Sequence, residues 1–186
     1  SSDIFSRQLN FSKFDLIYAG AQKNMGPAGT TVVIIKEDIL GKVSREVPSM
    51  LNYQTHLSKG SMFNTPSVFP VYVSMLTLEW LKDLGGIPFI EKVNQKKANL
   101  LYDEIDRNPL FKGVVEKEDR SYMNATFILE DDALKENFDN LWKEARINGL
   151  NGHRSVGGYR ASMYNALPLY SVQTLVDTMQ ELERKA

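Results

Sequence analysis

The chain has 186 residues, 42% of them hydrophobic, which is enough to bury a sizeable core in one domain or in two small ones. Its formal net charge is -1, and no run of Lys and Arg stands apart from acidic residues, so we expect no nucleic-acid partner. It contains no Cys, which excludes disulfides, thiolate metal sites and a cysteine nucleophile and favours a cytoplasmic location, and no apolar run suggests export or a membrane partner.

The first half of the chain predicts two strands followed by two helices. Residues 16–18 and 30–35 are short runs that are apolar on both faces, which is typical of strands buried in a layered α/β sheet. Residues 67–84 carry apolar side chains around most of a helix, so we expect a largely buried helix that ends at a pair of glycines. Residues 87–105 repeat the helical spacing with apolar residues on one side, so this helix should pack through one face only.

The second half of the chain predicts a small sheet covered by helices. Strands are expected at residues 113–115, 125–129 and 159–164. Apolar residues follow helical spacing from 134 to 145 and from 172 to 182. This alternation is the pattern of a compact α+β domain. The acidic run just before the first of these helices is expected to be the solvated start of that helix, and we expect no metal site there.

Lys23 lies between the first two predicted strands, in a glycine-rich segment. The strand would fix the root of this lysine, and the glycines leave no bulk around its tip, so one amine can be presented to a bound aldehyde and form a Schiff base. Such an amine must lose its proton, which desolvation and neighbouring cations favour, so the site should be partly buried and should contain arginines. The ordinary alternative for a single Lys is a solvated surface charge.

Three segments, 19–29, 60–66 and 152–166, together resemble the phosphoserine aminotransferases, which belong to the class V aminotransferase family of fold type I pyridoxal-phosphate enzymes. The resemblance runs along the whole chain, which looks like only the C-terminal half of such an enzyme. It implies an α/β fold, in which residues 1–88 are the C-terminal part of the large pyridoxal-phosphate domain and residues 89–186 are a small C-terminal α+β domain.

The resemblance also implies a cofactor site. Lys23 would form the Schiff base with pyridoxal 5'-phosphate and would carry the proton between substrate and cofactor, and Gln22 would lie beside the cofactor phosphate. Asn64 and Thr65 would reach the cofactor phosphate of the neighbouring subunit, which implies a homodimer with shared active sites. The alternatives are a polar strand end for Gln22 and ordinary helix capping for the residues around Thr65.

Two arginines and a histidine supply the implied substrate site. Arg160 matches the arginine that pairs with the substrate α-carboxylate, and His153 and Arg154 match residues that receive the side-chain phosphate or carboxylate. A guanidinium can bind such groups through two parallel hydrogen bonds. The alternative is that these side chains are exposed surface charges. The other histidine, His56, follows no matching motif and receives no role.

The implied reaction transfers an amino group between glutamate and 3-phosphohydroxypyruvate, giving phosphoserine and 2-oxoglutarate in serine biosynthesis. Another class V aminotransferase, such as an alanine-glyoxylate type, is an alternative that the His153–Arg154 pair argues against. A second alternative is a catalytically inert fragment, because the aspartate and the aromatic residue that hold the cofactor ring in this family would lie outside the chain. Such a fragment would also expose apolar strands.

Overall fold

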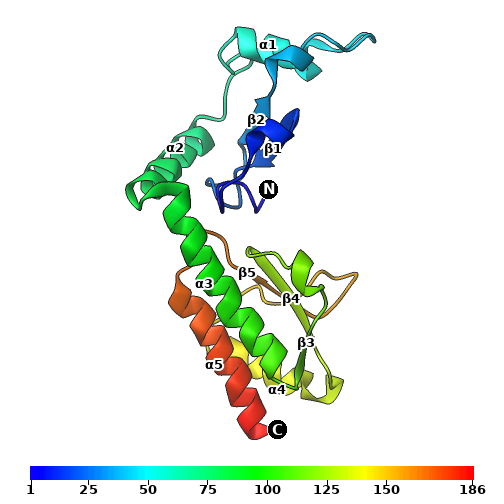
Figure 1. Ribbon diagram of the computed structural model, residues 1–186, viewed down its shortest axis with the longest axis vertical. Helices are drawn as coiled ribbons and strands as arrows, with labels where there is room; N and C mark the ends of the chain where they lie inside the picture. The colour runs from blue at the N-terminus through cyan, green and yellow to red at the C-terminus, as the bar shows by residue number, and fades with distance from the viewer.

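A computed structural model describes residues 1–186. The molecule is elongated, with β1 (Leu16–Gly20), β2 (Thr31–Ile35) and α1 (Tyr53–Ser58) toward one end (Figure 1). The long helix α3 (Gly86–Arg107) leads from α2 (Val68–Asp83) to the other end of the molecule. None of the helices combines the length and the hydropathy of a transmembrane segment.

The far end of the molecule holds the remaining strands and helices. The strands are β3 (Phe111–Gly113), β4 (Asn124–Leu129) and β5 (Tyr159–Ser162), and the helices are α4 (Lys135–Glu144) and α5 (Leu169–Lys185). They form an antiparallel sheet of order β3-β4-β5, and α5 lies beside α3 (Figure 1). The predicted α+β arrangement of this part is confirmed. Just ahead of α4, Asp131 caps the short 3-10 helix at Asp132–Leu134 and accepts a hydrogen bond from the backbone N–H of Ala133 at 2.8 Å.

A core of 19 buried residues holds this unit together, drawn mainly from α3, α4, α5 and one face of the sheet. Burial alternates along β4, so Ala125, Phe127 and Leu129 point into the core, and the opposite face of the sheet is left uncovered by these helices. Phe138 of α4 is fully buried in edge-on contact with the ring of Tyr159. Truncating such a ring to Ala typically destabilises a protein by about 3–5 kcal/mol.

The third predicted strand is displaced toward the N-terminus. The sequence favoured residues 113–115, but the strand spans Phe111–Gly113 and Val114 is 52% exposed. The ring of Phe111 enters the core, and the backbone of Phe111 pairs with Leu129. The buried ring of Phe111 therefore sets the register of this strand, whereas the sequence analysis expected Val114 and Val115 to do so.

The other end of the molecule has little core of its own. β1 and β2 are strands as predicted, and they pair with each other as a two-stranded antiparallel sheet. Ile4, Ala19, Ala21 and Met25 make the only buried hydrophobic cluster at this end. The expectation that both strands are buried is wrong for this chain, since Tyr18 is 70% exposed and no residue of β2 is buried. No further strand of this chain pairs with them.

Helix α2 is present as predicted, but it is not largely buried. Only Ser74 and Leu81 are buried, and Val68 and Phe69 are 70% and 71% exposed. A helix that is apolar around most of its surface needs cover on several sides, and this chain supplies it on little more than one.

Buried asparagines join the two ends of the molecule. The backbone N–H of Asn165, which follows β5, donates to the side-chain oxygen of Asn24 at 3.1 Å. Asn94 of α3 donates to the side-chain oxygen of Asn165 and to the carbonyl of Ser6, both at 2.9 Å, and Asn165 donates to the carbonyl of Phe5 at 2.9 Å. Buried polar groups are costly to leave unpaired, so these bonds fix the segment around Asn24 against the end of β5.

Candidate functional site

The turn after β1 presents Lys23 from a fixed root. The N–H groups of Met25 and Gly26 donate to the carbonyl of Ala21 at 3.0 and 2.9 Å, and Ala21 and Met25 are buried while Lys23 is exposed. Gly26 has φ 146° and lies so close to α2 that a Cβ there would be 2.9 Å from the Ser74 hydroxyl. Glycine is therefore required at this position, both for the backbone conformation and for the close approach to α2.

The Lys23 amine reaches across to the small sheet. Its Nζ donates to the hydroxyl of Tyr164 at 3.0 Å and lies 5.2 Å from the centre of that ring. Lys23 forms no ion pair with a carboxylate. The expected partial burial is not found in this chain, because nothing in it covers this face of the turn. The amine is nevertheless held in place, and it is free of any acidic partner.

Tyr164 is a candidate site residue that the sequence analysis did not identify. Its hydroxyl lies 3.4 Å from Asn124 Oδ1, which also accepts from the Ser162 hydroxyl at 3.2 Å. Partial burial acts to raise the pKa of Tyr164, but hydrogen bonds with Lys23 and Ser162 and the positive charges of Lys23 and Arg160 outweigh it, so this pKa lies below its ordinary value. The available signal was its position, four residues after Arg160 in the matching segment.

Arg160 lies on β5, on the face of the sheet that the helices leave uncovered. Its backbone is fixed by pairing with Thr126 and by donation of its N–H to the Leu150 carbonyl at 2.7 Å. The guanidinium is exposed and forms no ion pair within the chain, so its planar set of donors is available to an anion. The positive charge of Arg160 contributes to lowering the pKa of Tyr164, to which Lys23 donates, and the role of Arg160 beside the lysine stays a prediction.

The loop that carries His153 and Arg154 is closed at its base. The N–H of Gly152 donates to the carbonyl of Gly158 at 2.8 Å, and a Cβ at Gly152 would collide with the backbone of Gly157. His153 Nδ1 lies 2.7 Å from the Ser155 hydroxyl, and both His153 and Arg154 are exposed. The loop therefore presents an imidazole and a guanidinium next to the strand that carries Arg160.

The remaining predicted cofactor residues do not contact Lys23. Gln22, Asn64 and Thr65 are all exposed, and the one hydrogen bond of the Asn64 side chain is donated to the Thr65 carbonyl at 3.3 Å. The N-cap residue of α2, Ser67, makes no side-chain capping bond, and neither Asn64 nor Thr65 bonds to the helix start. The capping alternative for this segment therefore has no support in the structure.

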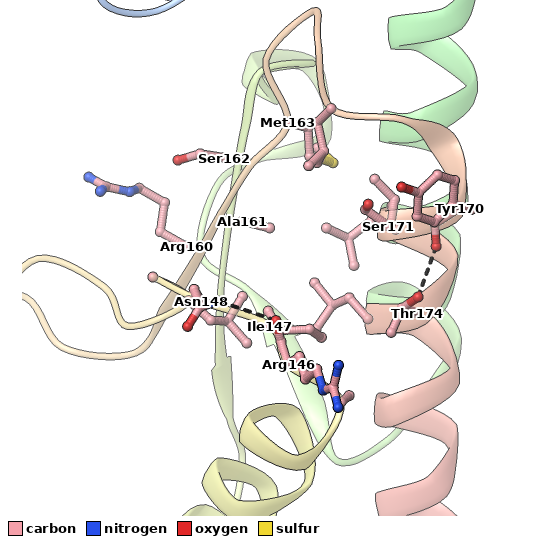
Figure 2. Close-up of a pocket in the computed structure, with 17 residues that line it drawn as sticks. Arg146, Ile147, Asn148, Arg160, Ala161, Ser162, Met163, Tyr170, Ser171 and Thr174 are labelled. Carbon is pink, nitrogen blue, oxygen red and sulfur yellow. Dashed lines mark hydrogen bonds between the residues drawn. The ribbon is translucent and has the colours of Figure 1, made fainter.

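A separate pocket of about 370 Å³ lies between β5, the segment after α4 and the first turns of α5 (Figure 2). Its lining is mainly apolar and includes Ile147 and Met163, with Arg146 at one end. Arg160 is the only predicted site residue in the lining, and Figure 2 shows its guanidinium directed away from the other labelled residues. This pocket is therefore distinct from the face on which Lys23 and Tyr164 meet.

Comparison with known sequences shows close relatives. The chain is 70% identical over 185 residues to the phosphoserine aminotransferase of Flavobacterium psychrophilum and 56% identical over 187 residues to that of Porphyromonas gingivalis. In both alignments the whole of this chain matches 52% of the relative. The chain thus spans about half the length of the curated relatives it matches.

Comparison with solved structures agrees with these relatives. A structure described as radiation damage of the Schiff base in phosphoserine aminotransferase has a TM-score of 0.95 at 48% identity, covering 100% of this chain and 52% of that chain. The phosphoserine aminotransferase from Bacillus circulans subsp. alkalophilus gives 0.94 at 43%, with the same coverage. An alanine-glyoxylate aminotransferase from Nostoc gives 0.76 at 16%, covering 97% of this chain and 52% of that chain, a likeness in fold alone.

The family assignment follows from the sequence. The expected α/β fold, with this chain as part of a pyridoxal-phosphate transferase, is confirmed by the structural matches. Residues 1–175 match the sequence model of the family described as Aminotransferase class-V. That match covers far more than half of the chain, so the chain belongs to the class V aminotransferases.

Proposed function

We propose that this chain is part of a phosphoserine aminotransferase that moves an amino group between glutamate and 3-phosphohydroxypyruvate with the help of pyridoxal 5'-phosphate. The names of the closely matching relatives support the substrate. The observation that carries the proposal is that the Lys23 amine donates to the Tyr164 hydroxyl at 3.0 Å, which brings the amine to the end of β5, the strand that carries Arg160. An amine and a guanidinium gathered in this way can serve one amino-acid substrate.

The residues of the Lys23 turn fit pyridoxal phosphate. The Lys23 amine has no carboxylate partner and projects from a rigid turn, so it is available to an aldehyde. Gln22 is exposed beside it and can donate to a phosphate from its side-chain amide. When bound, the cofactor supplies an electron sink for negative charge at the substrate carbon.

Lys23 is proposed to handle the proton. An amine that is free of the cofactor can take the proton from the substrate α-carbon and return it elsewhere, as a general base and then a general acid. For this work the amine must stay within reach of the substrate. Its anchored turn and its bond to Tyr164 supply that orientation.

Arg160, His153 and Arg154 are proposed to select the substrate. Arg160 would pair with the α-carboxylate that glutamate and phosphoserine share, through a planar two-bond contact. His153 and Arg154, on the exposed loop, would receive the side-chain phosphate of one substrate or the side-chain carboxylate of the other. Separate groups for the two anionic ends explain how one site can accept both acids.

The proposed enzyme is a homodimer in which Asn64 and Thr65 complete the partner's cofactor site. Both side chains are exposed and neither caps α2, so they are available to a phosphate outside this chain. The exposed apolar residues of α2 and β1 also support cover by further protein. We assign residues 1–88 to the large domain and residues 89–186 to the small one.

The test uses the full-length protein with its cofactor. Phosphoserine and alanine are added in turn while the absorbance of the bound cofactor is followed. A change with phosphoserine and none with alanine, abolished by Lys23→Ala and retained by Lys13→Ala at another exposed lysine, is the expected result. Reaction with alanine alone would favour an alanine-glyoxylate type of enzyme, and reaction with neither would favour an inert protein.

A further inference from the structure

The backbone of Tyr164 is held by a buried lysine. Lys97 of α3 is fully buried, and its Nζ donates to the carbonyls of Met163, Tyr164 and Leu167 at 3.0, 2.8 and 3.1 Å. No carboxylate is paired with this amine; its three donors end on three carbonyls of one short segment. The segment that follows β5 is therefore bonded through three carbonyls to a single ammonium group, and the carbonyl of Tyr164 is the second of the three.

The hydroxyl end of Tyr164 is held as well. Asn124 of β4 lies 3.4 Å from this hydroxyl through Oδ1, and its Nδ2 donates to the Ser2 hydroxyl at 3.1 Å. Ser162 donates to the same Oδ1 at 3.2 Å. A tyrosine that is fixed at both its backbone and its hydroxyl has little conformational freedom, so it can hold a flexible side chain such as that of Lys23 in one position.

The relative position of Lys23 and Tyr164 is fixed by the residues that follow them in the sequence. Asn24, next to Lys23, accepts a hydrogen bond from the backbone N–H of Asn165, next to Tyr164, at 3.1 Å. Both asparagines are buried. The contact between the Lys23 amine and the Tyr164 hydroxyl at 3.0 Å thus joins two turns that are already bonded to each other.

We propose that Tyr164 is a positioning residue for Lys23, whose hydroxyl holds the lysine amine whenever that amine is not bound to the cofactor. The consequence for turnover rests on the proposed function, because only there does a free Lys23 amine carry a proton. The pairing itself does not depend on it. Tyr164 thereby keeps the amine from swinging into solvent.

The first test measures the pair in the cofactor-free, full-length protein. Tyrosine labelled with 13C at Cζ reports the ionisation of each phenol by NMR, and Tyr164→Phe identifies the resonance of Tyr164. The charged groups facing this phenol are Lys23 and Arg160, with Lys97 at its carbonyl. We expect the titration midpoint of Tyr164 to move to higher pH in Lys23→Met, which keeps the stem and removes the amine, and to stay in place in Lys13→Met.

The second test measures turnover in the holoenzyme. Loss of a hydrogen bond to a charged amine should lower kcat roughly tenfold in Tyr164→Phe, with KM for phosphoserine within about twofold of its original value. Tyr170→Phe, at an exposed tyrosine of the same region with no bonded hydroxyl, is the matched control and should change neither value.

Three results would overturn the inference. They are a Tyr164 midpoint that does not respond to Lys23→Met, an unchanged kcat in Tyr164→Phe, and a rise in KM with kcat unchanged, which would assign Tyr164 to substrate binding. A protein that keeps the Lys23-dependent titration but does not transaminate phosphoserine would contradict the proposed function while supporting the pairing of Lys23 with Tyr164.

Discussion

Replacing Lys97 by Met tests the role of the buried ammonium group. Burial lowers the pKa of Lys97 from 10.5 to about 8, which corresponds to a cost of about 3 kcal/mol for keeping it charged at neutral pH. Against this, the amine satisfies three carbonyls of one segment, and leaving them without a donor costs about 5 kcal/mol in total, most of which a neutral amine also prevents because it still donates hydrogen bonds. Lys97→Met removes both effects, so we expect a net loss of about 2 kcal/mol in the free energy of unfolding at pH 7.

The pH dependence of this loss has a definite sign. The folded pKa of Lys97 lies below its unfolded value, so between pH 8 and 10.5 the unfolded chain binds the proton that the folded chain has released. The stability of the wild type relative to Lys97→Met should therefore rise through this window, by about 2 kcal/mol at pH 9.5 compared with pH 7.

Urea unfolding of the full-length protein at these two pH values measures both quantities. Lys96→Met is the matched control, since Lys96 is the neighbouring residue on the same helix and is exposed. It should change the stability by less than about 0.5 kcal/mol at either pH. A Lys97→Met variant as stable as the wild type at pH 7, or a stability difference that does not change with pH, would refute the reasoning.

Three further substitutions in the full-length enzyme test the proposed site. Arg160→Lys should raise KM for glutamate and for phosphoserine about tenfold each in steady-state assays, because the point charge of an ammonium group cannot replace the planar donors of a guanidinium. An effect on one substrate only would contradict a role at the α-carboxylate that both substrates share. Arg154→Ala should reduce kcat/KM for phosphoserine several-fold more than for glutamate, and equal losses would count against separate anion subsites. Asn64→Ala should weaken pyridoxal-phosphate binding by about tenfold in a fluorescence titration, whereas an unchanged affinity would remove Asn64 from the cofactor site.

Hydrophobic periodicity predicted the elements that pack within this chain. The apolar face expected for residues 87–105 is the buried face of α3, where Leu101 and Ile105 enter the core. The alternation around Phe127 is the alternation of β4. In these elements the partners that bury the apolar residues lie within the same 186 residues, so the pattern and the burial agree for the apolar residues. The burial of the charged residues Lys97 and Glu104 on α3 was not predicted.

Burial could not be predicted where the partners lie elsewhere. The sequence of α2 is apolar on several sides, and β1 and β2 are apolar on both faces, but this chain covers only part of each. Periodicity reports which surface needs cover, and it does not report which chain segment supplies it. The burial of Lys23 could not be predicted for the same reason, because Lys23 is exposed where no segment of this chain covers it.

The contact between Lys23 and Tyr164 could not be predicted for a different reason. The two residues are 141 positions apart, and their approach depends on the hydrogen bonds of Asn24, Asn94 and Asn165. Buried asparagines have no periodic signature, so side-chain pairing across such a distance appears only in the folded structure. The resemblance of residues 152–166 to a known family predicted Arg160 as a substrate-binding residue, but it predicted no role for Tyr164.

The unequal division of the hydrophobic core has a consequence for the order in which the chain acquires structure. One end contains 19 clustered buried residues and the other only 4, so the two ends should not open with the same free energy. Amides of β4 and α5 should resist hydrogen exchange long after those of β2 have exchanged. During synthesis the sheet of β3, β4 and β5 can close as a local folding unit, while α2 and the β1–β2 pair stay loosely held until outside surfaces cover them.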